Sequence, residues 1–183
     1  TIDPSTGVTN FVLLLPNLVG QQIGSDGINL YYFGGSQPAI AFQLIDLVTR
    51  ITTPIPMTSN YGESRGVAFY NSNFILSSSS HDFYTVALDG TVTQINSGIG
   101  DRKGFACVNH KFYAVSTNDN KLYEIDPNDG STISSTTITL NTGETVTQGI
   151  ALTANPNTGV MYAMLNTQIT SGRKFVILRC QKL

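Results

Sequence analysis

The chain of 183 residues has no tryptophan, only two cysteines and few charged side chains. The last two of these limit the kind of protein that it can be. Two cysteines do not form a disulfide framework, so the fold must rest on a hydrophobic core. Aspartate, glutamate, lysine and arginine make up 12% of the residues, and the basic ones are scattered rather than gathered in a stripe. This pattern argues against nucleic-acid binding. No apolar run approaches the length of about 20 residues that spans a bilayer, so we expect no membrane insertion.

The polar residues that are present are mostly uncharged. Serine, threonine and asparagine account for 53 of the 183 residues. Such a surface is typical of an extracellular or cell-surface protein, which is the location we expect. No segment of ten residues shows helical periodicity, and short apolar runs separated by turn residues indicate an all-β fold.

One short frame recurs four times along the chain. Its copies are Gln21-Gln22-Ile23-Gly24, Arg65-Gly66-Val67-Ala68, Lys103-Gly104-Phe105-Ala106 and Gln148-Gly149-Ile150-Ala151. Each copy is followed by a turn and further β-type runs, and a repeat of about 40 residues built from short strands predicts a β-propeller. We expect the small residue that ends each frame (Gly24, Ala68, Ala106, Ala151) to let the innermost strands converge on a common axis.

The repeat predicts one domain over residues 1–183, a small propeller of about four blades with four antiparallel strands each. Three blades are expected at about 19–55, 63–96 and 101–140, and the fourth combines 147–183 with the N-terminal strand in 1–15. That strand would close the ring and remove two exposed sheet edges. The same number of strands would also fit two chains that pair into a larger ring, or an N-terminal strand that completes a blade of a neighbouring molecule.

Residues 121–130 and 149–163 carry a resemblance to a known group of repeats. The runs Leu122-Tyr123-Glu124-Ile125-Asp126-Pro127 and Gly149-Ile150-Ala151-Leu152 stand in the order seen in units of the form LYxIDPxTG … GLAxDPxTGxLYA. The chain therefore resembles the YVTN/NHL-like propellers of secreted and surface proteins of bacteria and archaea. The resemblance implies an architecture and leaves the function open, because one fold serves many functions.

The residues just before the innermost strands are the candidates for a binding site at the channel mouth. Equivalent positions in the four repeats hold two amides and two cations, namely Gln21, Arg65, Lys103 and Gln148. We expect a third cation, Arg102, and the loop residues His81 and Asp82 beside them. A small polar or anionic ligand, such as a sugar, would suit this set. The alternative is that Glu63 with Arg65, and Asp101 with Lys103, neutralise one another as exposed ion pairs.

No residue pattern predicts catalysis or a bound metal. His81 beside Asp82 lacks a positioned nucleophile, and the Asp126 to Gly130 turn lacks the distal glutamate of a calcium loop. We therefore expect no enzyme activity, no cofactor and no metal. The functional hypothesis is a non-catalytic extracellular module that works by self-assembly or adhesion, with itself, another surface protein or a glycan as partner. Ligand binding at the channel mouth is the alternative, and a lyase or hydrolase is a third possibility.

Overall fold

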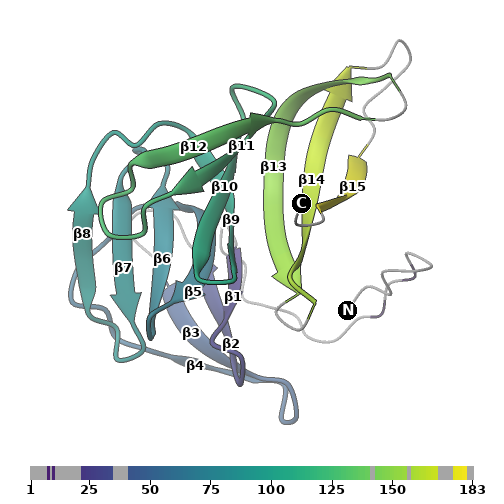
Figure 1. The fold of residues 1–183 in the computed structure, drawn as a ribbon. Coiled ribbons are helices and arrows are strands. Elements are labelled where there is room, and N and C mark those ends of the chain that lie inside the picture. Colours follow the sequence, from purple (N-terminus) through teal and green to yellow (C-terminus); the bar gives the residue numbers. More distant parts are fainter. Residues whose placement is uncertain are drawn as a thin grey trace.

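The computed structural model describes residues 8, 10, 22–34, 41–140, 143–155 and 158–168, and the backbone of 175–180. This part of the chain contains fifteen β-strands and no helix, hence none that could span a membrane. The strands form four antiparallel sheets, each made from strands that follow one another in the chain (Figure 1). Each sheet corresponds to one sequence repeat, and we call the sheets blades 1 to 4.

Blades 1 and 2 have four strands each, in the sheet orders β1-β2-β3-β4 and β5-β6-β7-β8. The strands of blade 1 are β1 (Gln22–Ser25), β2 (Leu30–Gly34), β3 (Ala41–Asp46) and β4 (Ile51–Pro54). Those of blade 2 are β5 (Ser64–Tyr70), β6 (Asn73–Ser78), β7 (Phe83–Ala87) and β8 (Val92–Asn96). Both blades match the predicted repeats.

Blade 3 also has four strands, and three strands of blade 4 are described. Blade 3 contains β9 (Arg102–Val108), β10 (Lys111–Ser116), β11 (Lys121–Ile125) and β12 (Thr132–Thr137). Blade 4 contains β13 (Thr145–Asn155), β14 (Val160–Gln168) and β15 (Phe175–Cys180). The fourth strand expected here, from residues 1–15, falls almost wholly outside the described residues, so its closing role stays a prediction.

The first strand of every blade lies at one edge of its sheet, and these four strands are neighbours in space. β1 packs beside β5, β5 beside β9, and β9 beside β13. Among the described residues, no packing of comparable extent joins β13 back to β1. The four blades therefore form an arc of propeller type, and the expectation of a closed ring is not met in the described part of the chain.

Each pair of neighbouring blades shares one apolar cluster. Aromatic rings dominate between blades 1 and 2, where Phe33, Phe42 and Phe74 pack in stacked and edge-to-face pairs. Phe112 and Ile125 are buried between blades 2 and 3, and Leu165 between blades 3 and 4. Successive residues of a strand point to opposite faces of the sheet, so a central strand of an inner blade can supply side chains to the clusters on both faces.

The innermost strands of neighbouring blades meet backbone to backbone at two glycines. A Cβ built on Gly66 would lie 3.0 Å from the backbone nitrogen of Gly104, and one on Gly104 would meet the backbone of Ala151 at 2.5 Å and that of Leu152. Gly104 also has φ of 54°, a conformation that costs other residues free energy. The strands thus converge two positions before the predicted Ala68 and Ala106, so the expected steric reason was assigned to the wrong residue of the frame.

Candidate functional site

Arg65 and His81, two of the predicted site residues, lie near one buried carboxylate, that of Asp101. Asp101, which directly precedes β9, has a side chain only 8% exposed. Its Oδ1 atom lies 3.7 Å from Nη1 of Arg65 on β5 and 3.9 Å from Nε2 of His81 in the β6–β7 loop. The distance to Arg65 is that of an ion pair rather than a hydrogen bond, and the contact with His81 is an ion pair only when its imidazole is protonated. Asp101 is thus paired across the boundary between blades 2 and 3, instead of with the adjacent Lys103 as the sequence alternative supposed.

Several other predicted site residues have local partners. The guanidinium of Arg102 stacks on the ring of Tyr123, with its Cζ atom 3.6 Å from the ring centre, and donates a 3.4 Å hydrogen bond to Thr132. Asp82 accepts a hydrogen bond from the hydroxyl of Tyr84 at 3.4 Å and is not the partner of His81. Arg102 is therefore occupied within blade 3, and the pairing of His81 with Asp101 replaces the one suggested by sequence adjacency.

Of the remaining predicted residues, Gln148 and Lys103 belong to the described part of the chain. Gln148 on β13 accepts a 2.8 Å hydrogen bond from the side-chain amide of Asn166 on β14. Lys103 on β9 is partly buried. Gln21 lies outside the described residues. The structure thus brings Arg65 and His81 together and leaves Arg102 and Gln148 in separate blades, and a shared ligand for this set stays a prediction.

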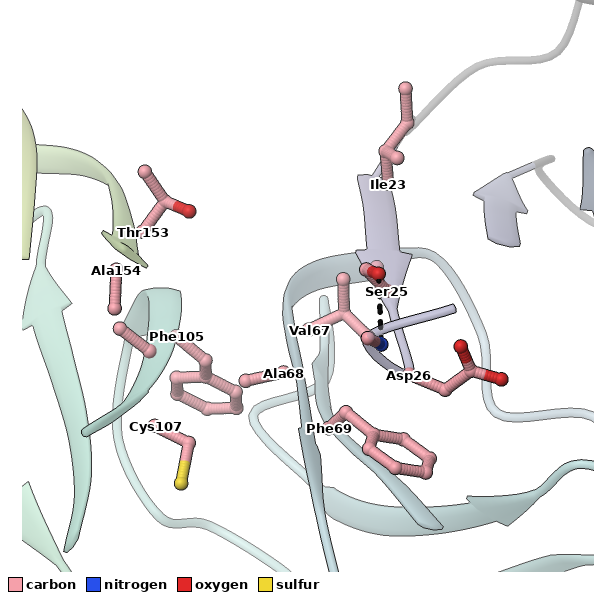
Figure 2. Close-up of a pocket in the computed structure, with 13 residues that line it drawn as sticks. Ile23, Ser25, Asp26, Val67, Ala68, Phe69, Phe105, Cys107, Thr153 and Ala154 are labelled. Atoms are coloured by element: carbon pink, nitrogen blue, oxygen red, sulfur yellow. Dashed lines mark hydrogen bonds between the residues drawn. The ribbon is translucent and has the colours of Figure 1, made fainter. Parts of the chain in front are cut away.

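A hollow lies in the middle of the arc, toward the opposite ends of the same strands. Its volume is about 370 Å³, and residues from β1, β5, β9 and β13 line it. Most of the lining side chains are apolar or small: Ile23, Val67, Ala68, Phe69, Phe105, Ala106 and Ala154. Figure 2 shows Thr153 and Ala154 on one side of the hollow, facing Ile23 and Ser25 on the other. The innermost strands are closest at Gly66 and Gly104 and leave space farther along.

The charged and hydroxyl groups at the rim are held by their own turn. Asp26 accepts hydrogen bonds from the backbone of Ile28 at 2.8 Å and of Asn29 at 2.6 Å, and from the Tyr31 hydroxyl at 3.0 Å. Its side chain points away from Thr153 and Ala154 in Figure 2. Ser25 accepts from the Gly27 backbone nitrogen and donates to the Asn29 carbonyl. Neither side chain offers an uncommitted charge to the interior of the hollow.

The other polar groups that border the hollow belong to the main chain. β1, β5, β9 and β13 are each the terminal strand of a sheet, so one edge of each has no neighbouring strand within the described sheets. Such an edge presents backbone N–H donors and carbonyl acceptors. An apolar wall with main-chain hydrogen-bonding groups along it suits a ligand that combines apolar surface with a few neutral polar atoms.

Cys107 on β9 is the one free thiol among the described side chains, and it lines the hollow. Burial raises the pKa of its thiol, so the reactive thiolate is disfavoured at neutral pH. In the described residues, no group of three or more histidine, cysteine, aspartate or glutamate side chains could hold a metal ion. Cys107 is therefore a chemical probe placed in the wall of the hollow.

Comparisons with known proteins give the fold. No protein-family model matches the chain, and no curated protein sequence does. Among solved structures, the glutaminyl cyclase of Myxococcus xanthus is 16% identical, with a TM-score of 0.59, and the match covers 90% of this chain and 75% of that one. A nidogen/laminin complex matches at 13% identity and a TM-score of 0.61, over 90% of this chain and 66% of the other. At such identities the likeness shows a propeller-type fold alone.

The comparison also corrects the functional hypothesis drawn from the sequence. A non-catalytic module for self-assembly or adhesion was expected, but the similar structures include an enzyme, the glutaminyl cyclase. That hypothesis rested on the uncharged polar surface, the lack of a catalytic residue set and the exchangeable N-terminal strand, and the enzyme among the similar structures contradicts it. The resemblance to YVTN/NHL-like repeats holds at the level of the propeller-type fold. The repeat type, the secreted location and the absence of enzyme activity stay predictions.

Sequence reasoning placed the candidate site at one end of the channel and missed the hollow at the other. The lining residues are the second halves of the predicted frames, such as Val67-Ala68 and Phe105-Ala106, which were assigned to packing alone. A signal was present in the repeat, because strands predicted to converge on a common axis also border any space along that axis.

Proposed function

We propose that the chain binds a small, uncharged and largely apolar molecule in the central hollow. The observation that carries this proposal is the hollow itself, about 370 Å³ in volume and lined mainly by apolar side chains. Sites for small molecules typically have volumes of roughly 300–1,000 Å³ and mostly apolar walls. Contact with these walls removes apolar ligand surface from water, which contributes roughly 25 cal/mol for each Å² buried.

The preference for an uncharged ligand follows from the lining. Asp26 is the one charged side chain there, and it is directed away from the hollow and bound by its own turn. A ligand charge would lose its hydration without gaining a partner, which is costly. Neutral hydrogen-bond donors and acceptors of the ligand cost less to bury than a charge, because they can form hydrogen bonds with the main-chain edges of β1 and β13.

The test uses Nile red, a neutral apolar dye, as the probe. We expect saturable fluorescence enhancement with one dye for each chain. Thr153 is exposed on β13 at the side of the hollow, so Thr153→Trp should fill the space without disturbing the core and weaken binding at least tenfold. The matched control is Thr93→Trp, an exposed threonine on the outer strand β8, and it should leave binding unchanged.

A second readout places the dye. In a Cys180→Ser background Cys107 is the single thiol, and its alkylation by N-ethylmaleimide should slow when the dye is bound. Equal dye binding by the two tryptophan variants, or an alkylation rate that the dye does not change, would overturn the proposal.

A further inference from the structure

Two hairpin tips of blade 1 carry large apolar side chains in solvent. Ile28 in the β1–β2 turn and Val48 in the β3–β4 turn are each 91% exposed, and Leu47 and Ile51 beside Val48 are exposed as well. Single exposed apolar residues are common on protein surfaces, but a group of four on adjoining turns of one blade marks an interaction site.

The fold itself does not require these residues, because the other blades use polar ones at the same places. The turns that correspond to Ile28 hold Asn71-Ser72 in blade 2 and Asn109-His110 in blade 3. The turn that corresponds to Leu47-Val48 is Pro127-Asn128-Asp129 in blade 3. In blade 2 it is Leu88-Asp89-Gly90, with a single, less exposed apolar residue. The apolar tips are thus a property of blade 1 rather than of the repeat.

Both tips are fixed by an aspartate at their base. Oδ1 of Asp26 accepts the Ile28 backbone hydrogen bond, and Oδ1 of Asp46 accepts those of Val48 at 2.7 Å and Thr49 at 3.1 Å. The turns lie at the same end of the sheet, because Leu30 pairs with Ile45. They are separated by about two strand spacings, or roughly 10 Å. Tips held in this way lose little conformational freedom when a partner binds.

The same hydrogen bonds keep acidic charge next to the apolar groups. Burial pushes the pKa of Asp26 up, but hydrogen bonds from Asn29 and Ile28 outweigh it and hold this pKa below its ordinary value. Hydrogen bonds from Thr49 and Val48 do the same for the pKa of Asp46. Both carboxylates are therefore ionised at neutral pH, and Arg50 is the one cation in these two turns.

We infer that the tips of blade 1, formed by Ile28, Leu47, Val48 and Ile51 with Asp26 and Asp46 at their bases, dock a protein partner that presents an apolar patch bordered by lysine or arginine. Apolar contact would supply affinity, and the flanking carboxylates would favour a basic rim. A lipid surface fits less well, because the two carboxylates would approach the headgroups without a compensating group of cations.

The test uses an amphipathic helical peptide of leucine and lysine as the probe, with a leucine and glutamate peptide of the same pattern as its control. Calorimetry should show binding of the lysine peptide and at least tenfold weaker binding of the glutamate peptide. Ile28→Ser/Val48→Ser should weaken binding of the lysine peptide at least tenfold, whereas Leu88→Ser in the equivalent turn of blade 2 should not. Asp26→Asn/Asp46→Asn keeps an oxygen acceptor in each turn and should reduce the preference between the peptides.

Equal binding of the two peptides, or unchanged binding by the Ile28→Ser/Val48→Ser variant, would overturn the inference. Tip-dependent sedimentation with phosphatidylcholine vesicles in the absence of peptide binding would assign the tips to a membrane and would overturn it too. Circular dichroism checks that each variant is folded, which we expect because Ile28, Asp46, Val48 and Leu88 are exposed and Asp26→Asn keeps the oxygen that accepts the hydrogen bonds of its turn. Nile red binding should be the same in the Ile28→Ser/Val48→Ser variant, whose residues do not line the hollow, so this test can fail while the proposed function stands.

Discussion

Replacing Gly104 by alanine should break the contact between blades 3 and 4. The added Cβ would lie 2.5 Å from the Cα and carbonyl carbon of Ala151 and would also clash with the backbone nitrogen of Leu152. All three atoms belong to the main chain of β13, so no flexible side chain can move aside. Relief requires that β9 and β13 separate, which would loosen the apolar cluster beneath them, with Val115, Leu152 and Leu165.

Three contributions determine the expected change in the free energy of unfolding. The φ of 54° at Gly104 costs an alanine about 1–2 kcal/mol. Overpacking against the backbone typically adds about 1–3 kcal/mol. Alanine also lowers the entropy of the unfolded chain, which returns about 0.4–1 kcal/mol. The net loss in the free energy of unfolding should therefore be about 1–5 kcal/mol, a large part of the stability of an ordinary domain.

The measurement is urea denaturation followed by circular dichroism, with Gly98→Ala as the control. Gly98 has φ of 69°, and a Cβ there would meet nothing within 4 Å, so the control shows the conformational cost alone. Gly104→Ala should be less stable than the control by about 1–3 kcal/mol, the overpacking part. If the two variants lost the same free energy, the argument that main-chain contact at Gly104 joins the blades would be refuted.

Two further predictions concern the core and acidic conditions. Phe112→Ala removes a fully buried ring between blades 2 and 3 and should lower the free energy of unfolding by about 3–5 kcal/mol in urea; a loss below about 1 kcal/mol would contradict the assigned burial. Hydrogen bonds within their turns hold the pKa values of Asp46, Asp89 and Asp129 below normal. The stability that these carboxylates add is complete above their unfolded pKa of about 3.9 and is lost as the pH falls through their folded pKa values. The urea concentration at the unfolding midpoint should therefore decrease once the pH is below about 4. A midpoint that stays constant down to about pH 2 would contradict the assignment.

The sequence predicted the blades because each repeat contains its own strand and turn signals. Asp-Gly is a strong turn signal, and Asp89-Gly90 forms the turn between β7 and β8, where Gly90 has φ of 91°. The strands that carry Ile75 and Phe112 contain continuous apolar runs, as expected for strands covered on both faces, and these residues are buried. Such features depend on neighbours a few residues away, which one sequence can reveal.

The candidate site was less predictable, because it depends on how separate blades meet. Asp101 follows the repeat of blade 2 and is adjacent in sequence to Arg102 and Lys103, yet its partners are Arg65 and His81. The position of the hollow depends on where the innermost strands diverge, and this is determined by the contacts at Gly66 and Gly104. The spacing of residues along the chain predicts neither the partners of Asp101 nor the position of the hollow.

The three apolar clusters each join two consecutive blades, and this gives the protein a sequential kind of stability. An inner blade is held by two interfaces and an outer blade, in the described arc, by one. Stability in such arrays is approximately a sum of unit terms and nearest-neighbour terms. Partial opening should therefore begin at blade 1 or blade 4 and proceed inward, and the pair formed by blades 2 and 3 should be the last to come apart. The hollow, which needs all four innermost strands, would be lost in the first of these steps, so its occupancy and the attachment of the outer blades are thermodynamically linked.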